Sequence, residues 1–241
     1  YGYSDIETPT FEYFDLFSRE VGTVPSKDLY KFFDREGNTL VLRPDFTPSV
    51  ARAAAKYFLE DGFPVRLCYQ GSTFINNSSY QGRLKESTEM GVELIGDDSI
   101  DADAEILTMT VEMLKKTGLS EFQISVGQVD FFKSLIEEAH MSEETVMELR
   151  ELISNKNHFG VEELIASQKL PSRLEQAFLR LPQLFGSSDI LQEAKELTDN
   201  PRALAAVRRL EQIYEILKLY GADRYVSFDL GMLSKYKYYT G

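Results

Sequence analysis

The sequence contains almost no cysteine. Its only one, Cys68, lies between Leu67 and Tyr69 in a strand-like run. One cysteine can form neither an internal disulfide bond nor a cluster of thiolate zinc ligands. We therefore expect a protein of the reducing cytoplasm whose fold does not depend on disulfides or zinc.

Long apolar runs are missing as well. No run approaches the roughly 20 apolar residues that a membrane-spanning helix requires, so we expect no membrane helix. The start shows no signal-peptide pattern. Hydrophobic residues still make up 43% of the 241 residues, enough for one large domain or one domain with an insertion. The chain begins at Tyr1 without methionine and stops at Gly241 inside a strand-like segment, so we expect both ends to be cut.

Positive charge is scarce. The chain has 26 Lys and Arg against 39 Asp and Glu, a net charge of −13. Such a surface repels a polyanion over about a Debye length, so nucleic-acid binding would need a local basic patch. The candidates are two short pairs, Arg208 with Arg209 and Lys235 with Lys237. The charge balance therefore lowers the expectation of a nucleic-acid partner.

Several catalytic patterns are absent. No glycine-rich phosphate loop precedes a helix. We interpret His140 and His158, the two histidines, as ordinary structural residues, with a Ser/His/Asp system as the alternative. The acidic run 97–105 lacks the central glycine and distal glutamate of a calcium loop, so we interpret it as carboxylates at a helix N-terminus. We expect no metal and no cofactor.

The first half alternates strand and helix patterns. Pro9 and the three-residue spacing of Phe11, Phe14 and Phe17 predict a helix over 8–20. A hairpin is predicted over 30–44 and an Ala-rich helix over 47–60. Strands are predicted over 65–74, 84–96 and 122–128. The helix before the last strand ends at Gly118, and its apolar positions are Ala104, Leu107, Val111 and Leu114.

The second half reads as helical from 129 to 220, with strands again over 225–233 and 235–241. Ser172 and Glu175 have capping-box spacing. Asn200 and Pro201 predict the start of a helix. Its apolar face is predicted to contain Ala203, Val207, Leu210, Ile213, Leu217 and Tyr220.

These patterns predict an α+β fold with a mostly antiparallel sheet flanked by helices. We expect a core over residues 1–139, a helical insertion over 140–199, and a resumed core over 200–241.

Two groups of polar residues accompany predicted strands, one just after a strand and one along a strand. Asp45 and Thr47 follow a strand where a helix begins, and Glu89, Gly91 and Glu93 alternate onto one face of a strand. Tyr238 and Tyr239 add hydroxyls from the last segment. Such carboxylates and hydroxyls suit a small cationic molecule such as an amino acid. The alternative is a solvated sheet face.

Four segments carry a family resemblance. They are "YGYSDIETPTFE" at the start, "LRPDFT" at 42–47, "YQGSTF" followed by "QGRLKESTEMGVELIG", and "KYKYYTG" at the end. In this order they resemble the first motif, the LRPEGT segment, the second motif and the RGLDYYTG histidine signature of the histidyl-tRNA synthetase family. The resemblance implies the catalytic core of a class II synthetase fold.

The departures from that pattern fall on arginines. The family's second motif reads F-R-x-E, and its arginine holds the α-phosphate of ATP; here the matching positions are Ile75 and Asn77. The arginine of the histidine signature matches Ser234, and its glycine and aspartate match Lys235 and Lys237. Loss of one positioned charge donor typically costs on the order of a hundred- to a thousand-fold in rate. We therefore expect little adenylate formation.

A synthetase fold without these arginines resembles the family of ATP phosphoribosyltransferase regulatory subunits. This resemblance implies a non-catalytic subunit that pairs with the short-form catalytic subunit in a hetero-oligomer, an octamer, and takes part in feedback inhibition by histidine. It also implies no tRNA partner, because the family lacks the synthetase's anticodon-binding domain. It also implies self-association as a dimer, for which residues 1–20 are the predicted region. The alternative for Phe11, Phe14 and Phe17 is packing within the subunit's own core.

Residue matching places a histidine ligand among seven positions. Asp45 and Thr47 match residues that face its ammonium group, and Glu93 matches the acceptor of its imidazole. Glu89 replaces a glutamine, so a cation is needed for the ligand carboxylate, and Arg83 is the candidate. Tyr238 and Tyr239 complete the predicted site. Two other functions stay open: a divergent synthetase that still acts as a ligase, and a free-standing amino-acid sensor.

Overall fold

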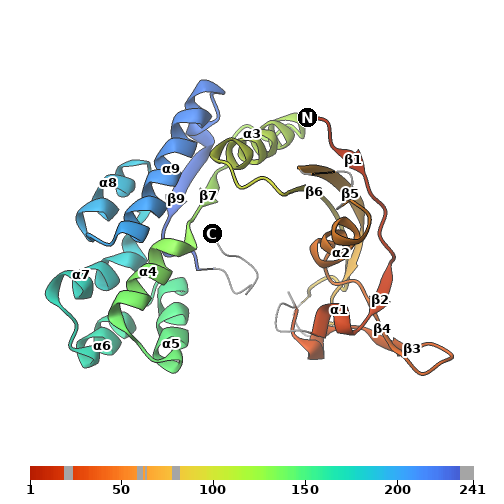
Figure 1. The fold of residues 1–241 in the computed structure, drawn as a ribbon, viewed down its shortest axis with the longest axis horizontal. Coiled ribbons are helices and arrows are strands. Elements are labelled where there is room, and N and C mark those ends of the chain that lie inside the picture. Colours follow the sequence, from red (N-terminus) through yellow and green to blue (C-terminus); the bar gives the residue numbers. More distant parts are fainter. Residues whose placement is uncertain (19–23, 59–61, 63, 78–81, 234–241) are drawn as a thin grey trace. The chain divides into compact units, whose positions relative to one another are not determined.

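The computed structural model describes residues 1–18, 24–58, 62, 64–77 and 82–233. The described part divides into two compact units, residues 1–98 and residues 99–233 (Figure 1). The predicted strand over 235–241 lies outside the described residues. In the described ranges, every helix is too short or too polar to span a bilayer.

The first unit contains a long β-hairpin. β5 (Val65–Phe74) and β6 (Glu86–Ile95) pair antiparallel along their whole length, which confirms the strands predicted over 65–74 and 84–96. β1 (Ser4–Asp5) pairs parallel with β5. α2 (Thr47–Tyr57), predicted over 47–60, packs on the hairpin through a small core of Phe46, Val50, Val65 and Leu67.

A second sheet in this unit has the order β2–β4–β3. β3 (Lys31–Phe33) and β4 (Thr39–Leu42) form the predicted hairpin, and η1 (Ser26–Asp28) precedes them. The helix predicted over 8–20 is wrong, because β2 (Phe11–Tyr13) pairs with β4, and among the described residues 8–18 only α1 (Asp15–Ser18) is helical. Pairing with β4 satisfies the backbone of residues 11–13 and outweighs the helical spacing of the phenylalanines.

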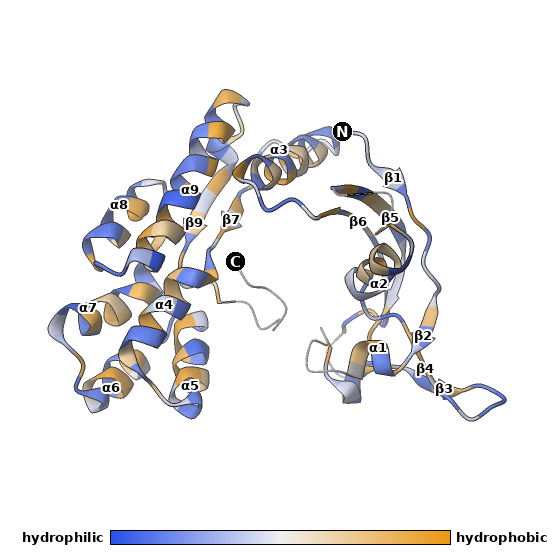
Figure 2. Cartoon of the chain, in the orientation of Figure 1, coloured by the Kyte–Doolittle hydropathy of each residue, from blue (hydrophilic) through white to orange (hydrophobic). Residues whose placement is uncertain are grey.

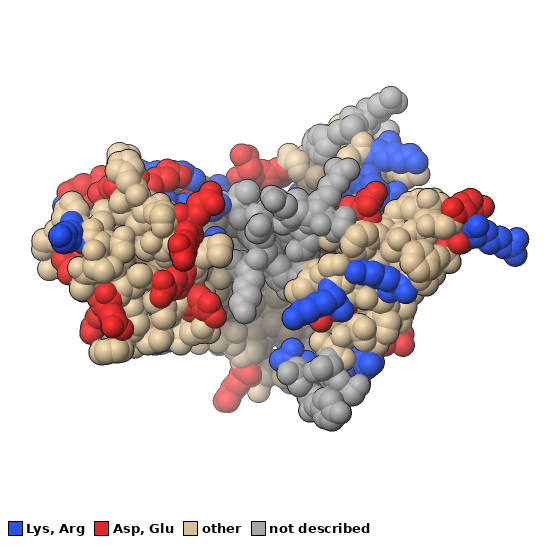
Figure 3. Space-filling view, turned by 90° about the horizontal axis from the view of Figure 1, so that it is seen from below, with Lys and Arg blue, Asp and Glu red and all other residues tan. Residues whose placement is uncertain are grey.

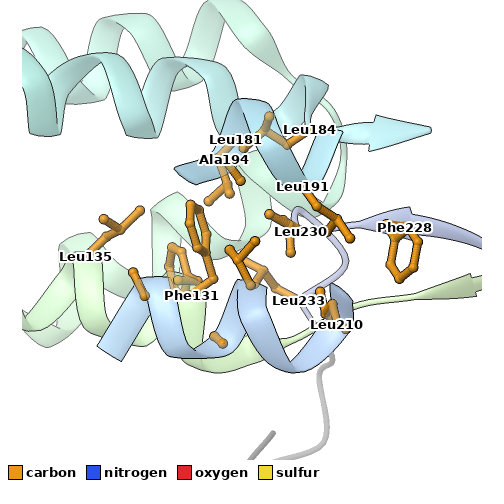
Figure 4. Close-up of a cluster of buried hydrophobic side chains, with 14 of the residues drawn as sticks. Phe131, Leu135, Leu181, Leu184, Leu191, Ala194, Leu210, Phe228, Leu230 and Leu233 are labelled. Carbon is orange, nitrogen blue, oxygen red and sulfur yellow. The ribbon is translucent and has the colours of Figure 1, made fainter. Parts of the chain in front are cut away.

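The second unit is mainly helical, and α9 packs against α3, α4 and α8. Its apolar faces, interleaved with hydrophilic residues in Figure 2, meet in one core that includes Phe131, Leu210 and Phe228 (Figure 4). The elements are α3 (Ile100–Lys116), α4 (Val129–Ala139), α5 (Glu143–Ser154), α6 (His158–Gln168), α7 (Ser172–Arg180), η3 (Leu181–Gln183), α8 (Asp189–Glu196), α9 (Pro201–Leu219) and η4 (Asp223–Tyr225).

The helix starts test the capping predictions. Asn200 accepts from the backbone N–H groups of Arg202 and Ala203, so the predicted N-cap of α9 is confirmed. Asp101 and Asp103 occupy the first turn of α3, as the acidic run predicted. The capping box at Ser172 is wrong, because α7 begins one residue earlier than that box requires: Pro171 is its N-cap and no side chain caps it.

The end of α9 also differs from its prediction. Tyr220 is exposed and lies past the helix, whereas the other five predicted apolar residues of α9 are buried or partly buried. Gly221 has φ +63°, a left-handed conformation that glycine adopts without strain, and it turns the chain away from the helix axis.

A small sheet completes the second unit. β9 (Val226–Asp229) pairs parallel with β7 (Ile124–Val126) and antiparallel with β8 (Phe185–Gly186). Over the described ranges, four of the six strand pairings are antiparallel, so the α+β prediction is confirmed. The strands form three separate three-stranded sheets there instead of one. The domain boundaries at 140 and 199 stay predictions.

One half-buried ion pair connects the helices to this sheet. Lys156, in the turn between α5 and α6, donates to both carboxylate oxygens of Asp229 at 2.8 Å. Asp229 also accepts from the backbone N–H of Gly231 at 2.8 Å. The end of β9 is thereby fixed to the helical hairpin of α5 and α6.

We expect Lys156→Met to reduce the free energy of unfolding by about 1–3 kcal/mol, because it leaves a half-buried carboxylate without its main partner. Lys218→Met is the matched control: it removes a lysine that pairs with Glu215 at an exposed position, where such pairs contribute little. Urea unfolding of both variants measures the difference. Equal effects would show that the Asp229 pair has no special role.

Candidate functional site

Thr47 joins the start of α2 to β6. Its hydroxyl donates to Glu93 Oε1 at 2.7 Å, and its backbone N–H donates to Asp45 Oδ1 at 3.1 Å. Asp45, just before α2, and Glu93, on β6, are therefore both hydrogen-bonded to Thr47. With their neighbours they form a group that we call the carboxylate cluster: Asp45, Thr47, Tyr69, Thr73, Glu89 and Glu93.

Tyr69 is the centre of the carboxylate cluster. Its hydroxyl forms a hydrogen bond with Thr47, and the charges of Glu93, Asp45 and Glu89 all act on it. Burial, followed by the nearby Glu93 carboxylate, raises the pKa of Tyr69 to about 12. The phenol therefore stays neutral at physiological pH and offers a hydrogen-bond donor among carboxylates.

A stack of three flat groups positions Tyr69. The guanidinium carbon of Arg43 lies 4.1 Å from the centre of the Phe46 ring, and the Phe46 and Tyr69 rings stack at 4.3 Å. Arg43 is almost fully buried, and it donates to the carbonyl oxygens of Thr8 and Ser72 at 2.8 Å each. Carbonyl groups of the segment before β2 and of strand β5 thus fix the Arg43 end of the stack.

Two glycines make room for the stack. A Cβ on Gly91 would lie 2.4 Å from the Tyr69 hydroxyl, and one on Gly71 would lie 2.6 Å from Arg43 Nη2. The hairpin register places Tyr69 opposite Gly91 and Gly71 opposite Glu89. Because real Cβ atoms do not approach other atoms so closely, a side chain at either position displaces a member of the stack.

The carboxylates differ in their surroundings. Glu93 is partly buried, and burial, together with the nearby charge of Asp45, raises its pKa above the ordinary value despite the bond from Thr47. Glu89 is exposed and accepts from the buried Thr73 hydroxyl at 2.8 Å. Within the described ranges no Lys or Arg forms an ion pair with Asp45, Glu89 or Glu93. This imbalance makes the cluster suited to a cationic group.

The structure brings together some of the predicted site residues but not all of them. The structure brings together Asp45, Thr47, Glu89 and Glu93. Arg83 lies exposed in the loop before β6, and in the part of the chain that the structure describes it forms no recorded contact with the carboxylate cluster. Tyr238, Tyr239 and the mismatched positions Ser234, Lys235 and Lys237 lie outside the described residues.

The loop after β5 continues the ladder with uncharged residues. The Ile75 backbone N–H donates to the Lys85 carbonyl oxygen at 3.0 Å, and strand alternation puts Ile75 on the same side as Thr73. The Asn77 side chain donates to the Leu84 carbonyl oxygen at 3.2 Å. Ile75 and Asn77 therefore close the hairpin loop.

The other residues considered as candidates are the basic pair Arg208 and Arg209 and the two histidines. Arg209 of the predicted basic pair is engaged by Asp103 at 2.7 Å, and acidic side chains are prominent over the helices on the face shown in Figure 3. His140 ends α4 in a left-handed conformation, and His158 begins α6. Within the described residues, no three Asp, Glu, His or Cys side chains are grouped as metal ligands.

Arg43, Tyr69 and Thr73 were not predicted as site residues. A signal for the last two was present, because Tyr69 and Thr73 alternate along β5 in the same way as Glu89 and Glu93 along β6. Pairing the two strands residue by residue would have placed Tyr69 opposite Gly91. The burial of Arg43 has no comparable signal, since an arginine after a strand is ordinarily exposed.

The family model described as histidyl-tRNA synthetase matches residues 1–241. The curated relatives include two proteins named ATP phosphoribosyltransferase regulatory subunit, from Acetivibrio thermocellus at 42% identity and from Ruminiclostridium cellulolyticum at 44%. The alignments cover 100% of this chain but only 57% and 58% of those relatives, so the chain spans less than two thirds of their length.

A solved structure gives the same result. An ATP phosphoribosyltransferase regulatory subunit/histidyl-tRNA synthetase from Bacillus halodurans matches with a TM-score of 0.90 and 35% identity, over 100% of this chain and 62% of that one. The class II synthetase-like fold expected from the four motifs is confirmed. Because the family model matches the chain from end to end, the chain belongs to the histidyl-tRNA synthetase family.

Proposed function

We propose that this chain is a non-catalytic regulatory subunit of ATP phosphoribosyltransferase, working in the cytoplasm with the short-form catalytic subunit at the first step of histidine biosynthesis. Relatives that carry that name match the whole chain at up to 44% identity. The observation that carries the proposal is Ile75, an apolar residue beside Thr73 where the synthetase motif has its phosphate-binding arginine.

The chemical reason concerns charge. Attack on the α-phosphate of ATP builds negative charge on phosphate oxygens, and positioned cations stabilise it. The carboxylate cluster offers the opposite charge, and Asn77 is engaged in the loop. A site of this kind binds a cation well but stabilises an adenylation transition state poorly. The replacement at Ser234 removes a second arginine by the same residue matching.

The ligand of the cluster in this proposal is histidine. Its ammonium group would approach Asp45 and Thr47, and its imidazole would donate to Glu93, with Tyr238 and Tyr239 completing the site. Glu89 disfavours the ligand carboxylate, and Arg83 supplies the compensating charge. Inhibition then requires that histidine bind one state of the complex more tightly than the other.

The proposed assembly is a hetero-octamer built on dimers of this chain. Phe17 is buried in the subunit's own core, whereas Phe11 and Tyr13 are 52% and 60% exposed. Both line a groove of about 850 Å³ with Leu16 and Leu40. This exposed aromatic surface, and not the whole of residues 1–20, is the proposed self-association region.

Mixing the purified protein with the short catalytic subunit tests the function. We expect phosphoribosyl transfer to ATP to rise on mixing, and added histidine to suppress that increase. ATP–pyrophosphate exchange driven by histidine is the discriminating control, because a ligase would show it and a regulatory subunit would not. Clear exchange, or no effect on the catalytic subunit, would contradict the proposal.

The raised pKa of Glu93 predicts a pH-dependent cost to stability. The folded state binds the Glu93 proton more tightly than the unfolded state, so stability falls as pH rises from the ordinary glutamate value through the raised folded value. Glu93→Gln keeps an acceptor for Thr47 and removes the titration. We expect the stability of the variant relative to wild type to be greater at neutral pH than at a pH below the ordinary glutamate pKa of about 4.3.

Chemical denaturation at the two pH values measures this gain. Glu89→Gln is the control, since Glu89 is an exposed carboxylate of the same cluster and its replacement should change stability little. An unchanged pH profile in Glu93→Gln would show that burial does not strain this carboxylate.

The self-association surface makes a separate prediction. Phe11→Ser combined with Tyr13→Ser should shift the protein from dimer to monomer in light scattering, because both exposed rings leave the groove. Phe33→Ser is the matched control, an exposed aromatic residue on β3 that does not line the groove. A dimer that survives the double substitution would rule out this surface.

A further inference from the structure

The second unit contains a cavity that the proposed function does not use. It has a volume of about 430 Å³ and lies against the sheet of β7, β9 and β8. Small-molecule sites typically have volumes of about 300–1,000 Å³. We call it the serine cavity, because its lining includes Ser125, Ser187, Ser188 and Ser227.

The floor is a pair of hydroxyls on neighbouring strands. Ser125 and Ser227 are register partners of β7 and β9, and their Oγ atoms lie 3.3 Å apart. Each hydroxyl can donate and accept a hydrogen bond. Strand alternation puts Gln123 and Asp229 on the same face as the two serines. Phe228 also borders the cavity, although its side chain is buried in the core.

An ordinary solvated sheet face would look different. Exposed strand positions favour β-branched or aromatic residues, which cover the backbone. Here the central positions are serines, which leave space above the strands. Ser227 is only 9% exposed and lies in a recess, whereas its partner Ser125 is exposed, so the serine pair is buried at β9 and open to solvent at β7.

One wall is aromatic and carries no net charge. Phe185 of β8, a residue that is 55% exposed, lines the cavity, and Lys156 Nζ lies 4.9 Å from the centre of its ring. The same lysine neutralises Asp229. A flat exposed ring beside hydroxyl groups suits a ligand that has one flat and one hydroxylated part.

The opposite wall supplies one cation. Arg224 lines the cavity next to Asp223, and its Nη2 donates to the Tyr225 hydroxyl at 2.7 Å, which fixes the guanidinium. Because Lys156 already pairs with Asp229, the charges left at this wall are the Arg224 guanidinium and the Asp223 carboxylate. One arginine matches a ligand with at most one phosphate, and a triphosphate would meet Asp223 without enough positive charge to balance it.

We propose that the serine cavity binds a ribonucleoside or its monophosphate. The base stacks on Phe185, the ribose diol exchanges hydrogen bonds with Ser125 and Ser227, and Arg224 holds the single phosphate. The site is independent of the carboxylate cluster, and its ligand can be tested without the catalytic subunit.

Calorimetric titration of the full-length protein with adenosine, AMP and ATP tests the site. We expect AMP to bind more tightly than adenosine, and ATP to bind more weakly than AMP. Ser125→Val combined with Ser227→Ala should weaken AMP binding by about tenfold or more, since two hydrogen bonds to the ribose are lost. Ser167→Ala, an exposed serine on α6 away from the cavity, should leave it unchanged.

Substitutions at Arg224 distinguish recognition of the phosphate from recognition of the nucleoside. Arg224→Gln should reduce AMP affinity to that of adenosine and leave adenosine binding unchanged, whereas Arg224→Lys should keep part of the AMP preference. Thermal melting confirms that each variant is folded. Three results would overturn the proposal: no binding of adenosine or AMP at millimolar concentration, tighter binding of ATP than of AMP, or binding that the double serine variant leaves intact.

Discussion

The contact between Tyr69 and Gly91 determines the carboxylate cluster. The phenol lies so close to β6 that a Cβ on Gly91 would be 2.4 Å from its hydroxyl. Phe46 and Arg43 stack behind the ring and keep it there. Tyr69 in turn sets the distance between the start of α2, which carries Asp45 and Thr47, and the strand that carries Glu93. Without this contact the same residues would form an ordinary solvated sheet face.

In the proposed function, the carboxylate cluster lets a synthetase fold keep amino-acid recognition without adenylation. Binding a cationic amino acid needs acceptors at fixed positions, and the stack on the hairpin holds them. Adenylation additionally needs cations around a phosphate, which the proposal assigns to single side chains such as the one at position 75. The backbone N–H of Ile75 donates to the Lys85 carbonyl oxygen, a ladder bond that does not depend on that side chain. Under this proposal, such side chains can be replaced while the binding face remains.

The helices and strands were predicted from the sequence more accurately than the contacts between segments that are distant in sequence. The hairpin of β5 and β6, the helix α3 and the N-cap Asn200 follow from local patterns and were predicted closely. The segment 8–20 was mistaken for a helix because its strand exists only through pairing with β4, which is distant in sequence. Tyr69 and Thr73 were missed because the residue-by-residue pairing of β5 with β6 was not predicted. Arg43 was missed because its burial depends on the carbonyl groups of Thr8 and Ser72, which only the fold brings together.

We infer that Tyr69, held against Gly91, organises a site for a small cationic ligand. Calorimetric titration of histidine into the wild-type protein and into Gly91→Ala tests this inference. We expect saturable heat for the wild type and its loss in the variant, because the added methyl group displaces Tyr69. Equal binding by the two proteins, or no heat from the wild type at millimolar histidine, would contradict it.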